Sequence, residues 1–181
     1  MKWTIPGTTV QIDTQEAARI PDVFSSMFLA GDIQLSQVCS VTGLEPYAVQ
    51  NWVKRGYLSP PVKKRYDLEQ LCRIITINML KPALALEQIC GLLRYINGDL
   101  DDERDDLIDD SRLYFLFLRL AAYHRQNQNS QEDYLSQILT DYHEPIPGAR
   151  ERVEKVLRIM LTAWSASQLR LAAERMTNEL I

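Results

Sequence analysis

The sequence predicts an all-α protein in which a helix-turn-helix with a small β-wing precedes a C-terminal helical bundle. Four short stripes of mainly apolar residues lie between positions 35 and 93. Three repeat at i, i+3, i+4 and i+7, and a shorter one over 49–53 at i, i+3 and i+4, the spacing of helices buried on one side. Glycine, proline and helix-capping residues separate these stripes. With 181 residues, 46% of them hydrophobic, the chain is long enough to bury a substantial core.

Residues 1–32 are expected to form an N-terminal helical preamble, with a short strand or a loop ahead of its first helix. Asp13 and Glu16 have the spacing of a capping box and predict the start of a first helix. A second helix is expected around residues 23–29, separated from the first by Pro21.

Residues 33–97 are expected to hold the helix-turn-helix and wing. Gly43 ends the first predicted helix, Pro46 occupies the first turn of the second, and Gly56 ends the second. The segment 57–66 is too short and too rich in proline for a helix, so it predicts a small two-armed wing.

The remainder is predicted to be an acidic linker over 98–110 and a C-terminal helical domain over 111–181, used for dimerisation or for an effector. A long helix is expected to begin near Ala149, with a kink or break at 165–167, where the apolar pattern loses its phase. Its predicted buried face carries Val153, Val156, Leu157, Met160, Leu161 and Trp164.

The composition indicates which cell compartment and which kinds of binding partner to expect. The first residues meet Pro6 and Gly7 before any apolar run develops, and no stretch has the length of a membrane span, so we expect a cytoplasmic protein with no membrane partner. Three widely spaced cysteines fit a reducing compartment. The net charge of -4 argues mildly against nucleic acid, but residues 54–65 contain five basic side chains and no acidic one.

The predicted helix 46–55 has two different faces. On a helical wheel, Val49, Trp52 and Val53 fall on one side. The opposite side carries polar residues at i, i+3, i+4 and i+7. These are Tyr47, Gln50, Asn51 and Lys54. One face is therefore expected to be buried and the other presented to a partner.

The presented face has chemistry suited to duplex DNA. Gln and Asn pair with adenine, Lys contacts guanine or phosphate, and a Tyr hydroxyl bonds a phosphate. The preceding helix, which starts near Ser36, would offer backbone amides to a phosphate, and the wing would add cations. The predicted DNA-binding residues are Ser36, Tyr47, Gln50, Asn51, Lys54, Arg55, Lys63, Lys64 and Arg65.

These segments resemble a known family. The run from Leu35 to Leu58, followed by 64–71 and 86–93, resembles the winged helix-turn-helix of MerR-type transcription regulators over residues 35–96. The stretch 50–58 further resembles an uncharacterised bacterial family, catalogued as a domain of unknown function and grouped with MerR-like proteins.

The MerR resemblance implies a homodimer that bends or untwists promoter DNA, with helix 46–55 in the major groove and wing 57–66 on the backbone. Two departures are visible. Gln50-Asn51-Trp52 stands where MerR proteins usually carry an Arg-Tyr-Tyr-type run, so the phosphate-binding arginine is absent at Gln50. An acidic linker and three predicted helices replace the usual single long C-terminal helix.

Other interpretations remain open. The same exposed helix would also serve a helical adaptor that binds another protein and no DNA. The three cysteines, Cys39, Cys72 and Cys90, lie at the i+4 position of apolar stripes, which favours core packing over metal binding. No phosphate loop, nucleophile elbow or His-carboxylate pair is evident, so we expect no enzyme activity, metal or cofactor. A small-molecule effector is left open.

Overall fold

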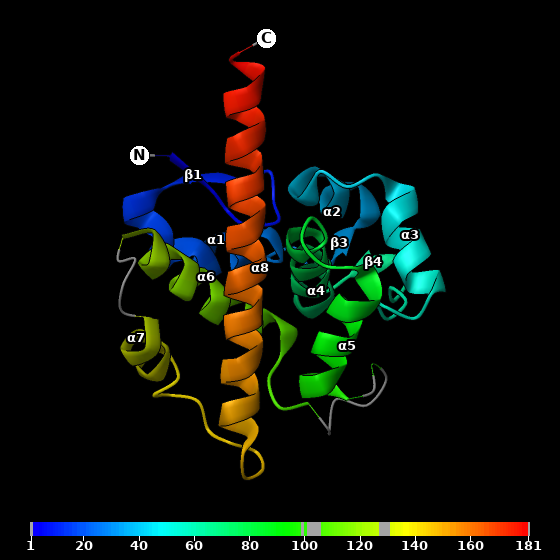
Figure 1. Ribbon diagram of the computed structural model, residues 1–181. Coiled ribbons are helices and arrows are strands. Elements are labelled where there is room, and N and C mark those ends of the chain that lie inside the picture. Colours follow the sequence, from blue (N-terminus) through cyan, green and yellow to red (C-terminus); the bar gives the residue numbers. More distant parts are fainter. Residues whose placement is uncertain (1, 99, 101–105, 127–130, 181) are drawn as a thin grey trace.

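The computed structural model describes residues 2–98, 100, 106–126 and 131–180. The described chain is mostly helical with a few short strands, in agreement with the predicted helical class (Figure 1). Its elements in chain order are β1 (Lys2–Thr4), β2 (Gln11–Asp13), the 3-10 helix η1 (Thr14–Arg19), α1 (Ile20–Met27), β3 (Ile33–Gln34), α2 (Leu35–Thr42), α3 (Pro46–Lys54), β4 (Arg65–Tyr66), α4 (Leu68–Leu80), α5 (Leu86–Asn97), α6 (Asp110–Gln126), α7 (Gln131–Ile138) and α8 (Ala149–Asn178).

The N-terminal segment begins with an antiparallel hairpin of β1 and β2, ahead of η1 and α1. Ile5 is fully buried, and the amide of Asn78 on α4 donates to the Gly7 carbonyl at 3.0 Å. The Thr9 amide donates to the carbonyl of Val41 on α2 at 2.8 Å. The segment predicted as a helical preamble thus contains a hairpin that is tied to the helix-turn-helix.

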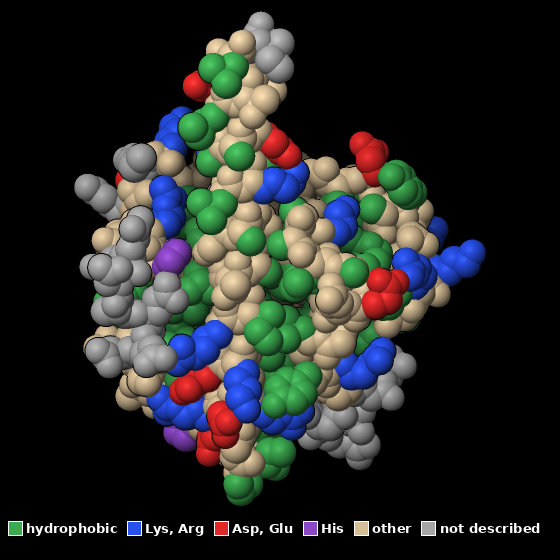
Figure 2. All heavy atoms as spheres, in the orientation of Figure 1, with side chains coloured by type: hydrophobic (Ala, Val, Ile, Leu, Met, Phe, Trp, Pro, Cys, Tyr) green, Lys and Arg blue, Asp and Glu red, His purple; other side chains and the backbone are tan. Residues whose placement is uncertain are grey.

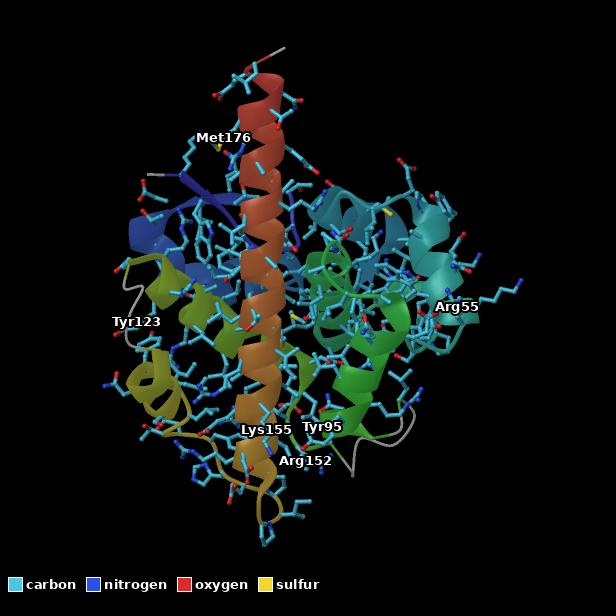
Figure 3. The ribbon with its side chains drawn as sticks, in the orientation of Figure 1. Arg55, Tyr95, Tyr123, Arg152, Lys155 and Met176 are labelled. Carbon is cyan, nitrogen blue, oxygen red and sulfur yellow. The ribbon has the colours of Figure 1, made fainter. Side chains whose placement is uncertain are left out.

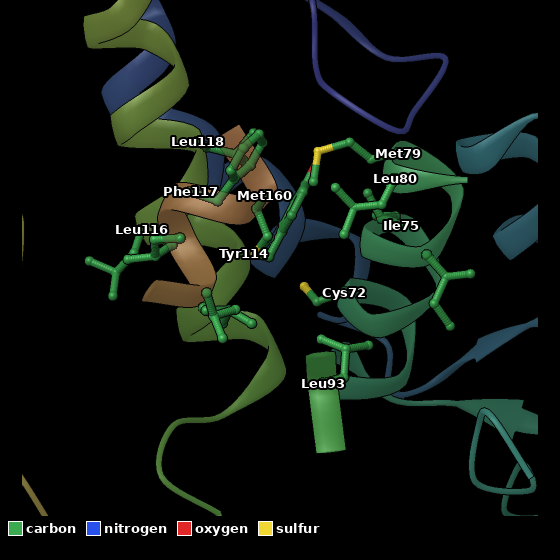
Figure 4. Close-up of a cluster of buried hydrophobic side chains, with 14 of the residues drawn as sticks. Cys72, Ile75, Met79, Leu80, Leu93, Tyr114, Leu116, Phe117, Leu118 and Met160 are labelled. Atoms are coloured by element: carbon green, nitrogen blue, oxygen red, sulfur yellow. The ribbon is translucent and has the colours of Figure 1, made fainter. Parts of the chain in front are cut away.

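Helix α4 lies at the centre of the molecule, with ten of its thirteen residues buried. It packs against α2 and α5 on one side and against α6 and α8 on the other. Figure 4 shows Cys72, Ile75 and Leu80 of α4 facing Tyr114 and Phe117 of α6. The segments predicted as an N-terminal module and a C-terminal domain therefore share one hydrophobic core.

The segment predicted as the acidic linker falls largely outside the described residues, which leave out Asp99, Asp101, Asp102, Glu103 and Asp105. Its described end packs against the core, because Leu107 and Ile108 are buried. The Leu107 amide donates to the Ile96 carbonyl at 2.9 Å.

Helix α8 runs without interruption from Ala149 to Asn178, so the predicted kink at 165–167 is wrong. The predicted buried face from Val153 to Trp164 is confirmed. The apolar pattern changes phase near Ser167 because nearly all residues beyond it are exposed. The last turns of the helix project past the rest of the molecule (Figure 1). The phase change marks a change of environment and not a break in the helix.

A buried ion pair joins α4 to the start of α6. Arg73 Nη1 lies 3.0 Å from Asp110 Oδ2, with the two side chains only 7% and 13% exposed. The Nε of Arg73 donates to the Tyr57 carbonyl at 3.0 Å, so this one side chain also holds the segment that follows α3. Burial raises the pKa of the Asp110 carboxyl above its ordinary value of 3.8, and the Arg73 charge opposes the shift without cancelling it.

This shift predicts a pH dependence. Because the pKa of Asp110 is higher in the folded than in the unfolded chain, its favourable contribution to folding is present below the unfolded value and is lost as the pH rises through the folded value. The free energy of unfolding of the parent, minus that of Asp110→Asn, should therefore be larger at about pH 4 than at about pH 7. Urea denaturation at both pH values measures it, and a difference that grows with pH would show that Arg73 outweighs burial.

None of the helices in the described part of the chain has the length and apolar character that a bilayer crossing requires.

Candidate nucleic-acid interface

Helices α2 and α3, which a short turn at Gly43 joins, are the pair predicted to form the helix-turn-helix. Gly43 has a left-handed backbone with φ of 70°, and its amide closes α2 on the Cys39 carbonyl at 2.8 Å. Pro46 begins α3, where the missing amide hydrogen costs no helical hydrogen bond. Val49 and Trp52 are buried beneath α3, as predicted, whereas Val53 is only partly buried. The turn and this apolar face fix the orientation of α3.

The opposite face of α3 is open to solvent. Tyr47 is 73% exposed, and Gln50, Asn51 and Lys54 are exposed too. None of these four side chains makes a hydrogen bond or an ion pair with another residue in the described part of the chain. Figure 1 shows α3 at the outer edge of the molecule, and Figure 2 shows Lys and Arg side chains on that edge. The polar face that the periodicity predicts for this helix is therefore exposed.

The wing differs from the predicted two-armed hairpin. Strand β4 pairs with β3, which precedes α2, through the register Ile33 to Tyr66. Within the segment 57–66, a single bridge joins Val62 to Arg65. Tyr66 is buried, and β4 lies against β3 and α2.

Lys63 and Lys64 occupy the tip of a tight turn over residues 62–65, which we call the lysine turn. Lys63 and Lys64 both have positive φ, 50° and 64°, and the Arg65 amide donates to the Val62 carbonyl at 2.9 Å. A turn with two left-handed central residues normally carries Asn-Gly, because a side chain disfavours that backbone conformation. Both lysine side chains are exposed and make no ion pair with any described residue.

Replacing the two lysines of this turn is predicted to stabilise the protein. Replacing Lys63-Lys64 by Asn-Gly should raise the free energy of unfolding by about 1–2 kcal/mol, because both positions would then suit their backbone. The variant Lys63→Ala/Lys64→Ala removes the same charges and keeps the strained backbone, so it should show no such gain. Thermal and urea unfolding compare the two. Equal stability of both variants would mean that the turn stores no strain.

The remaining predicted site residues differ in whether their side chains already contact other groups of the protein. Arg55 pairs with Glu87 of α5 at 2.7 Å and lies over the Tyr57 ring at 4.7 Å, so its charge is already partly neutralised. Arg65 donates to the Asp32 carbonyl at 2.6 Å and remains exposed. Ser36 is exposed in the first turn of α2.

Glu87 was not singled out by the sequence. It lies 32 residues from Arg55 and also accepts a hydrogen bond from the Tyr57 hydroxyl at 3.2 Å. These hydrogen bonds help to lower the pKa of its carboxyl, after a larger effect of its own backbone amide. No local sequence pattern predicts a contact between residues so far apart. Only the fold shows that Arg55 is paired and is therefore less available to an anionic partner than the lysines.

The segment that holds α2, α3 and the lysine turn is locally basic. From Leu35 to Tyr66 the chain carries five basic side chains and one acidic one, Glu45.

No group of three or more His, Cys, Asp or Glu side chains placed to hold a metal ion occurs in the part of the chain that the structure describes. Burial raises the pKa of the Cys72 thiol well above 9.0, which disfavours the thiolate that metal binding needs.

Comparison with known proteins places this site within a family. Residues 27–117, half of the chain, match the family described as a domain of unknown function, DUF1836. The chain belongs to this family. The DUF1836 match runs from the end of α1 to the middle of α6, so it includes the helix-turn-helix, the lysine turn, α4 and α5. This description states no function, so the resemblance to MerR-type regulators stays a prediction.

A relative of this DUF1836 protein extends the similarity beyond the family match. The chain is 23% identical over 163 residues to the uncharacterized protein YkrK of Bacillus subtilis (strain 168), covering 82% of this chain and 70% of that protein. No solved structure matches the chain.

Proposed function

We propose that this protein binds duplex DNA through the outward face of α3 and the lysine turn, and regulates transcription from the sites that it binds. The observation that carries the proposal is that Tyr47, Gln50, Asn51 and Lys54 form one exposed polar face without partners in the described chain. Amide side chains on such a face suit adenine edges in the major groove, and a lysine suits guanine or phosphate.

The lysine turn supports the same proposal. Lys63 and Lys64 sit in a backbone conformation that glycine or asparagine would adopt at lower cost, and nothing in the described fold pairs with their charges. Strain retained in an exposed loop often serves a function. Here two cations at a fixed distance beyond α3 would contact phosphates that flank the groove.

Loss of affinity in a double variant tests the site. We expect Lys54→Ala/Lys64→Ala to weaken binding to a fluorescent duplex by about tenfold or more at low salt, because two phosphate contacts are removed. The duplex is first selected from random fragments by the purified parent. The control is Lys2→Ala/Arg94→Ala, which makes the same change in net charge at exposed positions away from α3.

Three outcomes are informative. Weaker binding of the first variant alone supports the proposed face. Equal binding by both variants and the parent would place the DNA site elsewhere. If the parent selects no DNA, the proposal fails, and the helical adaptor that uses α3 for protein contacts takes its place.

We also propose that the protein acts as a homodimer held by the outer face of α8. Six exposed residues of α8, and Leu180 two residues beyond its end, recur at alternating spacings of three and four, the pattern of a coiled-coil seam. None carries a charge, so two copies related by a two-fold axis would meet without like-charge repulsion. The seam residues are Ile159, Thr162, Ala166, Leu169, Ala173, Met176 and Leu180.

The seam is most exposed where α8 leaves the body of the protein. Leu169, Met176 and Leu180 are 73%, 66% and 88% exposed. Figure 3 places Met176 on the projecting end, and Figure 2 shows hydrophobic side chains along it. Large apolar side chains in such a row are unfavourable in water unless a partner covers them.

A charge on the seam should dissociate the dimer. We expect Leu169→Glu/Met176→Glu to convert a dimer into a monomer in sedimentation velocity at micromolar concentration, since each dimer would bury four carboxylates. Leu171→Glu is the matched control, because Leu171 is 41% exposed on the same helix and lies off the seam. A parent that sediments as a monomer, or a dimer that survives both seam substitutions, would contradict the assignment.

A further inference from the structure

A pocket lies away from α3. It is bounded by η1 and the start of α1 on one side and by α6 and α7 on the other. Its volume is about 480 Å³, within the usual range for pockets that bind small molecules. Most of its lining is apolar, with Ile20, Pro21, Phe115 and Leu118 among the walls. The pocket is therefore large enough for a molecule of one or two rings.

One wall of the pocket is aromatic. Tyr123 at the end of α6 and Tyr134 of α7 both line it, and their rings stack at 3.8 Å with an interplanar angle of 7°. Figure 3 places Tyr123 on the side of the molecule that carries α7, far from Arg55 at the end of α3. A flat wall of this kind favours planar ligands, which gain contact along a whole ring face.

The pocket has a single cationic side chain. Arg119 of α6 belongs to the lining, is exposed, and makes no ion pair or hydrogen bond with another described residue. The lining residues include no Asp or Glu that would neutralise it. A guanidinium presents a planar pair of donors that matches a carboxylate.

We propose that this pocket binds a small aromatic carboxylate, with the ring against the apolar and tyrosine walls and the carboxylate paired with Arg119. One cation on a mostly apolar lining suits a singly charged ligand with a large apolar part, and it is poorly matched to a polyphosphate. This inference is independent of DNA binding, since the lining shares no residue with α3 or with the lysine turn.

The test uses two probes that differ in charge and hardly in shape, 2-naphthoate and 2-naphthamide. Isothermal titration of the full-length parent should give naphthoate an affinity about tenfold or more above that of naphthamide, because only the acid forms a charge-assisted pair with Arg119. In Arg119→Gln the two affinities should become equal. Arg94→Gln, which removes an exposed arginine from α5, should behave as the parent.

A space-filling variant locates the binding. Ala122→Trp should abolish binding of both probes, because Ala122 lines the pocket and the indole would occupy it. Circular dichroism checks that this variant is folded. If it is not, the comparison of the two probes on the parent and on Arg119→Gln still decides, since Arg119 lies at the surface. Equal affinities for acid and amide on the parent, an unchanged preference in Arg119→Gln, or no binding of either probe would overturn the proposal.

Discussion

Arg73→Met is expected to lower the free energy of unfolding by about 3–5 kcal/mol, because it leaves the buried Asp110 carboxylate without its counter-charge. The substitution also removes the donor that satisfies the Tyr57 carbonyl, so the segment between α3 and β4 should loosen. Urea unfolding gives the first effect, and hydrogen exchange of the amides of Tyr57, Leu58 and Ser59 gives the second.

The matched variant is Arg73→Met/Asp110→Leu, which removes both charges. A buried pair replaced by apolar residues of similar volume often costs little, so the double variant should recover most of the stability lost in the single one. A double variant less stable than Arg73→Met would show that the ion pair contributes favourably by itself, and that the unpaired carboxylate is not the source of the loss.

Gln50→Ala/Asn51→Ala is expected to abolish sequence preference while sparing general affinity for DNA. Each side-chain amide that pairs bidentately with adenine discriminates by about 1–3 kcal/mol, so affinity for the selected duplex should fall by tenfold or more. Binding to a random duplex depends on phosphate contacts and should stay within about twofold of the parent. Competition titrations with the two duplexes measure both quantities.

Lys54→Ala/Lys64→Ala provides the opposite control, because it should weaken both duplexes together. Should the amide variant lose affinity for the random duplex as much as for the selected one, Gln50 and Asn51 would contact the backbone and not the bases. Unchanged affinity for both duplexes would remove α3 from base contact.

The helices could be predicted from the sequence because their signals are local. Val49 and Trp52 recur at helical spacing, Gly43 permits the left-handed turn, and Pro46 starts α3. The outward face of α3 follows from the same periodicity. These features depend on residues within one or two turns of each other, so no knowledge of distant contacts was needed.

The features that the sequence did not predict depend on distant contacts. The pairing of β4 with β3 joins residues more than thirty positions apart, and the Arg55 to Glu87 contact is of the same kind. The sequence predicted a kink in α8 because the apolar pattern loses its phase where the helix passes from buried to exposed surroundings, although the helix itself continues. The sequence predicts a short strand or a loop at the N-terminus but not the hairpin, because each strand has only three residues, too few for alternation to indicate a pair.

The salt dependence of DNA affinity tests the central claim most directly. If Lys54, Lys63 and Lys64 neutralise phosphates, the logarithm of the association constant should fall linearly with the logarithm of salt concentration, with about -2.7 of the slope per protomer due to these three lysines. The triple alanine variant should lose that part of the slope. Affinity that does not change with salt, or a triple variant with the slope of the parent, would show that this surface does not bind the DNA backbone.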